Sequence, residues 1–340
     1  MGYYLRRTAQ AVLTLVVAVT LAFVLFRLMP GGPIEAMRNR MIQQAAASGA
    51  GINTERIDDM VQLYTGIEPN QPIYIQYVNY LRDIILYQDF GESIRYSRPV
   101  FNILFEAMPW SVFISVYGLA LGYTANILLG AVMAYKEGTR FDQSSTVGAI
   151  LLNSIPYYVG AIVLLAIFAY NLEWFPTGGR YNTDLIAGFN VAFMVSILRH
   201  AALPILSSFI IGFGGRALAM RGNSIRILGE DYLRVARLRG ISSTRIATRY
   251  VARNAILPMY TQLMIGISAV FSSSVILEYI FTYPGVGWYT YGALKARDYP
   301  LLMGSFIFFT TVTIIGILVA DVTYGIVDPR ASTGDKNEAF

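Results

Sequence analysis

Six long apolar segments constrain the fold of this 340-residue chain more than any other feature of its sequence. Each reaches roughly 20 residues or more, the length at which a helix crosses ~30 Å of hydrocarbon. The segments lie at 8–28, 110–135, 145–170, 201–220, 255–281 and 301–324. Only 14% of the residues are charged, whereas soluble domains hold about a quarter. The sequence therefore predicts an all-α integral membrane protein with six transmembrane helices.

The basic residues of the short loops predict the orientation of these helices. With the N-terminus inside, fourteen basic residues fall on the inner side and only four in the short outer loops. Because inner loops are enriched in lysine and arginine, both termini are predicted to lie inside. No small-residue cleavage site follows the first apolar segment, which favours an uncleaved helix over a signal peptide. Orientation then accounts for the net charge of +5, and no nucleic-acid partner is expected.

The chain is expected to divide into four parts. These are an N-terminal transmembrane helix (1–30), an extracytoplasmic segment (31–109), a five-helix core (110–330) with a cytoplasmic loop at 221–254, and a cytoplasmic tail (331–340). In the extracytoplasmic segment, Tyr74, Tyr77 and Leu81 recur at helical spacing, which is typical of an interfacial helix. This helix is expected to pack on the bundle as a cap, to contact a partner, or to do both.

The composition excludes several kinds of chemistry. The chain has no cysteine, so disulfides, iron–sulfur clusters and thiolate catalysis are excluded. His200 is the only histidine, and we interpret it as a polar interfacial residue at a helix start rather than as a metal ligand. No GxxxxGK[ST] loop is present to hold phosphates. The chain is therefore expected to bind no cofactor and to be no enzyme by itself.

The cytoplasmic loop shows a pattern that a simple connector would not need. It contains a short helix whose start is marked by Glu230 and Asp231, where negative charge is favoured, and whose end is marked by Gly240. Within it, Tyr232, Val235 and Ala236 are predicted to share one face. The basic side chains of this helix take another face, and they are Arg234 and Arg237.

A second amphipathic helix is predicted directly after Gly240. Residues 242–244 (Ser-Ser-Thr) offer capping oxygens, and Ile246 and Tyr250 are expected to face the bundle. Arginines at 245, 249 and 253 form a stripe that reaches lipid phosphates. An ordinary positively charged inner loop would explain the arginines but not two capped helices. We therefore interpret the loop as a docking surface for a partner inside the cell.

The same loop carries a resemblance that covers nearly the whole chain. Residues 231–240 read DYLRVARLRG and residues 253–258 read RNAILP. Together with DFGES (89–93), WFP (174–176), PGVG (284–287), RDYP (297–300) and DPR (328–330), they resemble the dipeptide/oligopeptide permease family. These proteins are membrane-spanning subunits of ATP-binding-cassette importers, and the similarity is to the B-type branch. Arg234 stands where the broader importer pattern has a glutamate, as is usual in this branch.

The resemblance implies a function and a set of partners. The chain would be half of the translocation pathway of an ATP-driven importer of peptides or related oligomeric solutes in the cell membrane. A second homologous permease, two cytoplasmic subunits that use ATP and Mg, and an extracytoplasmic substrate-binding protein would complete the complex. ATPase coupling would involve Glu230, Asp231, Tyr232, Arg234, Val235, Ala236, Arg237 and Gly240. Import of oligosaccharides or metal complexes by the same fold is the alternative, and a secondary transporter or channel is a further one.

Charged residues and helix breakers in or beside the apolar segments have alternatives of their own. Glu278 either pairs with Arg297 or Lys295 as an outer gate or lies among lipid headgroups. For Arg216, snorkelling toward the inner surface is favoured over a substrate role. Pro156 is expected to kink its helix.

Overall fold

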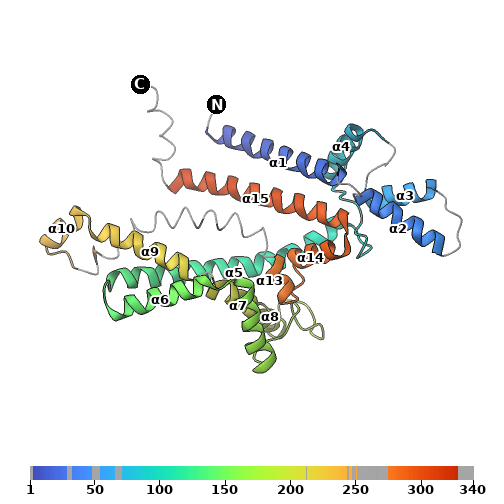
Figure 1. The fold of residues 1–340 in the computed structure, drawn as a ribbon. Coiled ribbons are helices and arrows are strands. Elements are labelled where there is room, and N and C mark those ends of the chain that lie inside the picture. Colours follow the sequence, from blue (N-terminus) through green and yellow to red (C-terminus); the bar gives the residue numbers. More distant parts are fainter. Residues whose placement is uncertain are drawn as a thin grey trace, which may run out of the picture. The chain divides into compact units, whose positions relative to one another are not determined.

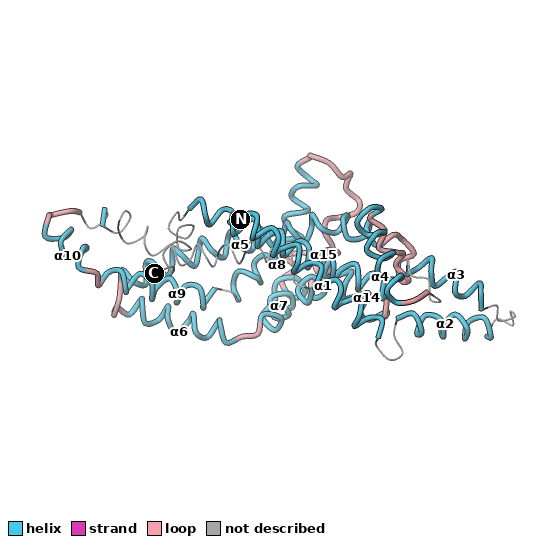
Figure 2. Tube along the Cα trace, turned by 90° about the horizontal axis from the view of Figure 1, so that it is seen from above, coloured by secondary structure: helices cyan, strands magenta, loops and turns pink. Residues whose placement is uncertain are grey.

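The computed structural model describes residues 3–28, 33–47, 54–65, 71–211, 213–242 and 275–327, together with 245, 246, 250, 263 and 266. These residues form helices and loops, with one isolated bridge between Glu92 and Pro99 (Figure 2). The prediction of a mostly helical protein is thereby confirmed. The chain divides into two compact units. Unit 1 comprises Met1–Ser111, Phe271–Val275 and Pro284–Phe340, and unit 2 comprises Val112–Val270 and Ile276–Tyr283.

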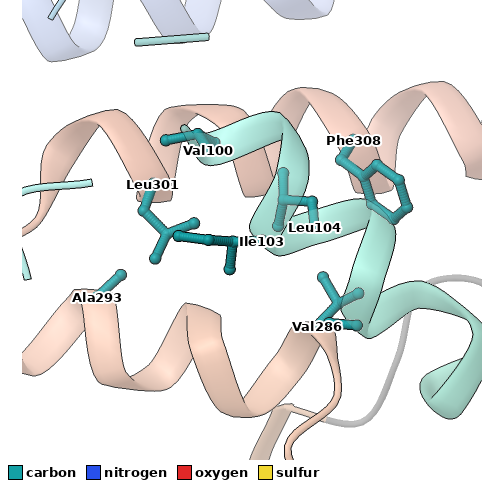
Figure 3. Close-up of a cluster of buried hydrophobic side chains, with 8 residues drawn as sticks. Val100, Ile103, Leu104, Val286, Ala293, Leu301 and Phe308 are labelled. Carbon is teal, nitrogen blue, oxygen red and sulfur yellow. The ribbon is translucent and has the colours of Figure 1, made fainter. Parts of the chain in front are cut away.

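Unit 1 contains both terminal helices. Its elements are α1 (Tyr3–Leu28), α2 (Pro33–Ala47), α3 (Thr54–Thr65), α4 (Ile73–Arg82), the π-helix η1 (Asp83–Tyr87), the first part of α5 (Val100–Tyr135), α14 (Val286–Ala296) and α15 (Tyr299–Val327). Helices α1 and α15 lie side by side (Figure 1). Beside them, α5, α14 and α15 share a buried cluster that includes Ile103, Leu104 and Leu301 (Figure 3). Burying such side chains stabilises the unit by about 2 kcal/mol each.

Helix α4, which belongs to the segment predicted to be extracytoplasmic, packs against α1. Its Tyr77 ring lies 5.3 Å from the Phe23 ring, and the Arg27 Nε donates to Gln76 Oε1 at 3.0 Å. The prediction of one apolar face is therefore correct for Tyr77, which packs on this core, but wrong for Tyr74, which is 71% exposed. In so short a helix, the spacing of the aromatic residues does not determine which of them is buried. The contact with α1 decides that Tyr77 is buried and Tyr74 is not.

Unit 2 contains the middle helices and α10, the first helix of the loop predicted to be cytoplasmic. Its elements are the remainder of α5, α6 (Arg140–Ser154), α7 (Tyr157–Leu165), the π-helix η2 (Ala166–Asn171), α8 (Val191–Ile211), α9 (Phe213–Leu228), α10 (Asp231–Leu238) and most of α13 (Val275–Ile280). Helix α5 thus contributes to both units.

The helices agree only in part with six predicted spans. Among the described residues, four helices are long and apolar enough to cross a membrane, at Leu5–Leu28, Val100–Tyr135, Val191–Ile210 and Tyr299–Val319. The predicted third span is instead a pair of helices bent by 94°. Pro156 begins the second member, and the preceding Ile155 is extended because proline disfavours helical backbone before it. The fifth predicted span, 255–281, lies mostly outside the described residues.

The fourth span begins about ten residues earlier than the sequence analysis predicted. Asn190 caps α8, since its Oδ1 accepts from the Phe193 backbone N–H at 2.9 Å. His200 therefore lies inside the helix rather than at its start, with its Nδ1 2.7 Å from the Ser196 carbonyl oxygen. Pro204 does not end the helix, and two serine hydroxyls donate to its carbonyl oxygen. A polar Arg-His pair was mistaken for a helix boundary because the cap lies nine residues upstream of Arg199.

Candidate functional site

Helix α10 presents an apolar strip to its surroundings. Asp231 occupies its first turn, where a carboxylate favours the positive end of the helix dipole. Leu233 and Ala236 point inward and are buried. Tyr232 and Val235 remain 41% and 48% exposed on the other side. The predicted grouping of Tyr232, Val235 and Ala236 is therefore wrong for Ala236, because apolar residues occur on both sides of this helix.

The C-terminal end of α10 is closed by a left-handed glycine. Gly240 has φ of +70°, and the Ile241 N–H donates to the Ala236 carbonyl oxygen at 3.2 Å. This is the six-to-one hydrogen bond that ends a helix when its C′ residue is left-handed. The predicted conformation of Gly240 is confirmed, and the turn sends the chain back beneath α10.

A buried cluster supports α10 from below. It joins Met220 and Ile227 of α9 to Leu233, Ala236 and Ile246. The expectation that Ile246 faces the bundle is confirmed, and Tyr250 packs at the edge of the same cluster. Two of the three arginines in the predicted basic stripe, at 249 and 253, lie outside the described residues. The side chain of Arg237 lies outside them as well. The exposed strip on α10 thus lies on a supported base rather than on an isolated loop.

An ion pair that the sequence analysis missed joins α9 to α6 within the same unit. The Arg221 Nε and Nη2 donate to the two carboxylate oxygens of Asp142 at 2.6 and 2.7 Å. Asp142 is 2% exposed, and it also accepts from the Gly138 backbone N–H at 3.0 Å. A two-pronged pair of this kind fixes direction as well as distance. The only available signal was an aspartate three residues after Thr139, the residue whose hydroxyl caps the start of α6.

Helices α5 and α9 cross closely beside this pair. A side-chain carbon added to Gly130 would stand 2.5 Å from the Ala217 carbonyl oxygen and 2.6 Å from the Met220 Cβ. Only glycine permits backbones to approach so closely. The crossing therefore fixes the position of α9, which leads directly into α10.

The Arg216 side chain lies against α5, at the level of Gly122 and Tyr123. Its guanidinium carbon lies 5.1 Å from the centroid of the Tyr123 ring on α5. A Cβ at Gly122 would stand 3.7 Å from its Nη1. Gly122 lies eight residues before Gly130, about 12 Å further from the C-terminal end of α5. An aromatic ring on the neighbouring helix thus holds the Arg216 side chain, and its inward snorkelling stays a prediction.

The two residues of the predicted outer gate belong to different compact units. Glu278 lies in α13 of unit 2 and is fully buried, whereas Arg297 ends α14 in unit 1 with a left-handed backbone. Their pairing stays a prediction. Within unit 2, burial raises the pKa of the Tyr283 phenol, the Glu278 carboxylate raises it further, and the Arg180 guanidinium opposes the rise. Glu278 and Arg180 thus both act on Tyr283 within unit 2.

A second buried aspartate, Asp298, organises the start of α15 in unit 1. Asp298 accepts from the Ser93 hydroxyl, from the Arg95 backbone N–H at 3.0 Å and from the Leu301 backbone N–H at 3.3 Å. Asp298 and Ser93 are both fully buried. The carboxylate therefore caps the start of α15 and anchors the loop that precedes α5. The sequence analysis noted both stretches but not their contact.

Comparisons with known proteins agree with this architecture. Residues 126–333 match the model of the family described as "Binding-protein-dependent transport system inner membrane component", and residues 1–121 match the N-terminal model of such membrane components. Three relatives, two from Bacillus subtilis and one from Haemophilus influenzae, each align over nearly their whole length.

The first relative, the oligopeptide transport system permease protein AppB of Bacillus subtilis, is 30% identical over 97% of this chain and 98% of its own. The dipeptide transport system permease protein DppB of that species is 30% identical over 96% and 97%. The oligopeptide transport system permease protein OppB of Haemophilus influenzae is 29% identical over 96% and 98%. The chain belongs to the family of binding-protein-dependent transport system inner membrane components. The resemblance to permease subunits of ATP-binding-cassette importers is confirmed, and with it a multi-pass location in the cell membrane.

Proposed function

We propose that this chain is a permease subunit of an ATP-driven peptide importer and docks an ATPase subunit through the exposed strip of α10. The observation that carries the proposal is the pairing of exposed Tyr232 and Val235 with buried Leu233 and Ala236 on one short helix. Exposed apolar side chains can form the centre of an interface with a partner protein. The buried cluster beneath them connects α10 to α9, so that a movement of the partner can displace both helices. Three relatives named as dipeptide or oligopeptide permeases support the choice of peptides as substrates.

The mechanism follows from how α10 is attached. Movement of a docked ATPase would displace α10, and the cluster around Met220 and Ile227 would pass that displacement to α9. The Asp142 pair would carry it on to α6. Alternating access then arises from tilting of these helices around a central pathway formed with a second permease. The orientation with both termini inside belongs to this proposal, since α10 must face the cytoplasm.

Tyr232→Asp tests the docking surface. A charge introduced on this strip must lose its hydration when the partner covers it, so substrate-stimulated ATP hydrolysis should fall by at least about tenfold. The measurement uses the reconstituted complex of both permeases, the ATPases and the binding protein. Phe189→Asp is the matched control, because Phe189 is a fully exposed aromatic residue on a loop remote in sequence.

Gly240→Pro tests the helix end independently. Proline fixes φ near −65°, which is incompatible with the observed +70°. Substrate should therefore no longer stimulate ATP hydrolysis in this variant, although the permease is still inserted in the membrane and assembled with its partners. Unchanged ATPase stimulation in both variants, at normal complex yield, would show that α10 is not the coupling point.

A further inference from the structure

Arg216 places a positive charge deep inside the bundle of unit 2. Its guanidinium lies over Tyr123, which precedes the end of α5 at Tyr135 by twelve residues, about 18 Å along the helix axis. Helix α5 is one of the helices apolar enough to span a membrane. The charge is therefore far from either membrane surface. Charged side chains at such depth are rare and usually mark a functional site.

This charge has no anionic partner among the described residues. The contact of Arg216 is with the aromatic ring of Tyr123, and no carboxylate pairs with it in that part of the chain. Arg221, five residues further along α9, is by contrast paired through two hydrogen bonds to Asp142. The ring attracts the cation through its electron-rich face but does not neutralise it. One arginine of α9 is thus satisfied, and the other retains the capacity to bind an anion.

Other groups near Arg216 fit a site for a polar ligand. Gly266 lies next to the Tyr123 phenol, because a Cβ there would stand 3.5 Å from the phenolic oxygen. One turn along α5, the amide nitrogen of Asn126 donates to the Gly122 carbonyl oxygen. The amide oxygen of Asn126 is buried with no hydrogen-bond partner among the described residues. An unpartnered acceptor in this position is suited to a ligand that brings an N–H donor.

We propose that Arg216 and Tyr123 form an anion-binding station that receives the terminal carboxylate of a peptide as it crosses the membrane. The inference rests on the proposed function and adds a binding site for the solute to it. Guanidinium presents paired donors that match a carboxylate in geometry and charge. A peptide also carries N–H groups next to that carboxylate, which the Asn126 oxygen can accept. Lipid phosphates offer the same anionic chemistry but lie at the membrane surface.

Uptake of two peptides that differ only at the C-terminus tests the station. One ends in a free carboxylate and the other in an amide, and both are transported by the complete complex in proteoliposomes. Arg216→Gln should reduce uptake of the free-carboxylate peptide by at least about tenfold, because a charge-assisted hydrogen bond is lost. Uptake of the amide should change by less than about twofold, within the scatter of neutral substitutions. Arg226→Gln, at the exposed end of the same helix, is the matched control and should leave the ratio unchanged.

A second variant does not depend on removing the arginine. Gly122→Asp places a carboxylate beside Arg216, because among the described residues only the Arg216 Nη1 is recorded within 4 Å of the new Cβ. This internal anion should compete with the peptide carboxylate and lower its uptake selectively. Gly122→Asn has nearly the same shape without the charge and should have much less effect. If Arg216→Gln fails to assemble, this pair decides the question.

The outcomes separate the inference from the proposed function. If the unmodified complex transports neither peptide, the proposed function fails and the inference fails with it. In the other case, the unmodified complex transports both peptides. If Arg216→Gln and Gly122→Asp then lower the uptake of the two peptides equally, or leave both unchanged, the inference alone is overturned. Vesicles of phosphatidylcholine with and without phosphatidylglycerol identify the anion. A variant effect that requires the anionic lipid and ignores the peptide terminus would also overturn the inference.

Discussion

Two buried aspartates, one in each compact unit, are stabilised in opposite ways. Asp142 in unit 2 is neutralised by the guanidinium of Arg221, which remains 26% exposed in its side chain. Asp298 in unit 1 is fully buried and is held by the Ser93 hydroxyl and by the backbone N–H groups of Arg95 and Leu301. One carboxylate has a charged partner on another helix, whereas the other has neutral donors from two chain segments.

The difference indicates different roles for the two sites. Neutral donors on backbone segments leave no alternative partner, so the Asp298 site is expected to stay intact whenever unit 1 is folded. The ion pair at Asp142 joins two helices by side chains alone, and a partly exposed guanidinium can exchange its partner for water. We therefore expect the Asp298 site to act as a fixed anchor and the Asp142–Arg221 pair to act as an adjustable joint between α6 and α9.

The anchor should show the largest loss of stability. Asp298→Ala leaves the Ser93 hydroxyl and two backbone N–H groups buried without an acceptor, and each stranded donor costs about 1–3 kcal/mol. We expect a loss of about 3 kcal/mol or more, measured as the thermal midpoint of the purified protein in detergent. Asp298→Asn retains one acceptor and should lose less. Asp184→Ala, at an exposed outer position, should have no effect. Equal midpoints for the Asp298 and Asp184 variants would show that the anchor is unimportant.

The joint should show a smaller loss that can be partly rescued. Asp142→Asn and Arg221→Gln each leave one partner of a buried pair unmatched, and the exposure of Arg221 reduces the cost to about 2 kcal/mol. The double variant removes both charges and should be more stable than the sum of the two single losses predicts. The thermal midpoints of the two single variants and the double variant, compared with that of the unmodified protein, form a double-mutant cycle that measures the interaction. Strict additivity would mean that the two side chains do not interact in the protein.

The crossing beside the joint should show the smallest loss of the three. Gly130→Ala forces a Cβ against the Ala217 carbonyl oxygen and the Met220 Cβ, so α5 and α9 must separate. Overpacking of this kind costs about 1–3 kcal/mol, and a partial shift of α9 should keep the loss near the lower limit. In Gly148→Ala on α6, the new Cβ would meet no heavy atom of the described residues within 4 Å, so this variant should be neutral or slightly stabilising. A larger loss for Gly148→Ala than for Gly130→Ala would contradict the close crossing.

The sequence predicted those features of the structure that are determined by residues close together in the chain. The apolar segments predicted a helical membrane protein, and the charge and glycine pattern predicted the start and end of α10, including the left-handed Gly240. The turn toward Ile246 and Tyr250 was predicted for the same reason. Helix length, capping and a positive φ are decided within a few residues, so they can be inferred from the sequence.

Tertiary structure alone decided which side chains meet. Asp142 and Arg221 are 79 residues apart, and Ser93 and Asp298 are 205 residues apart, so no spacing rule connects them. The orientation of α10 was not determined by its own sequence either, since apolar residues occur on both of its sides and the cluster around Met220 selects Leu233 and Ala236. The direction of the Arg216 side chain was likewise not determined by its own sequence, because a long side chain can extend in either direction along a helix. Its direction is fixed by Tyr123 on a neighbouring helix that the sequence alone does not place beside it.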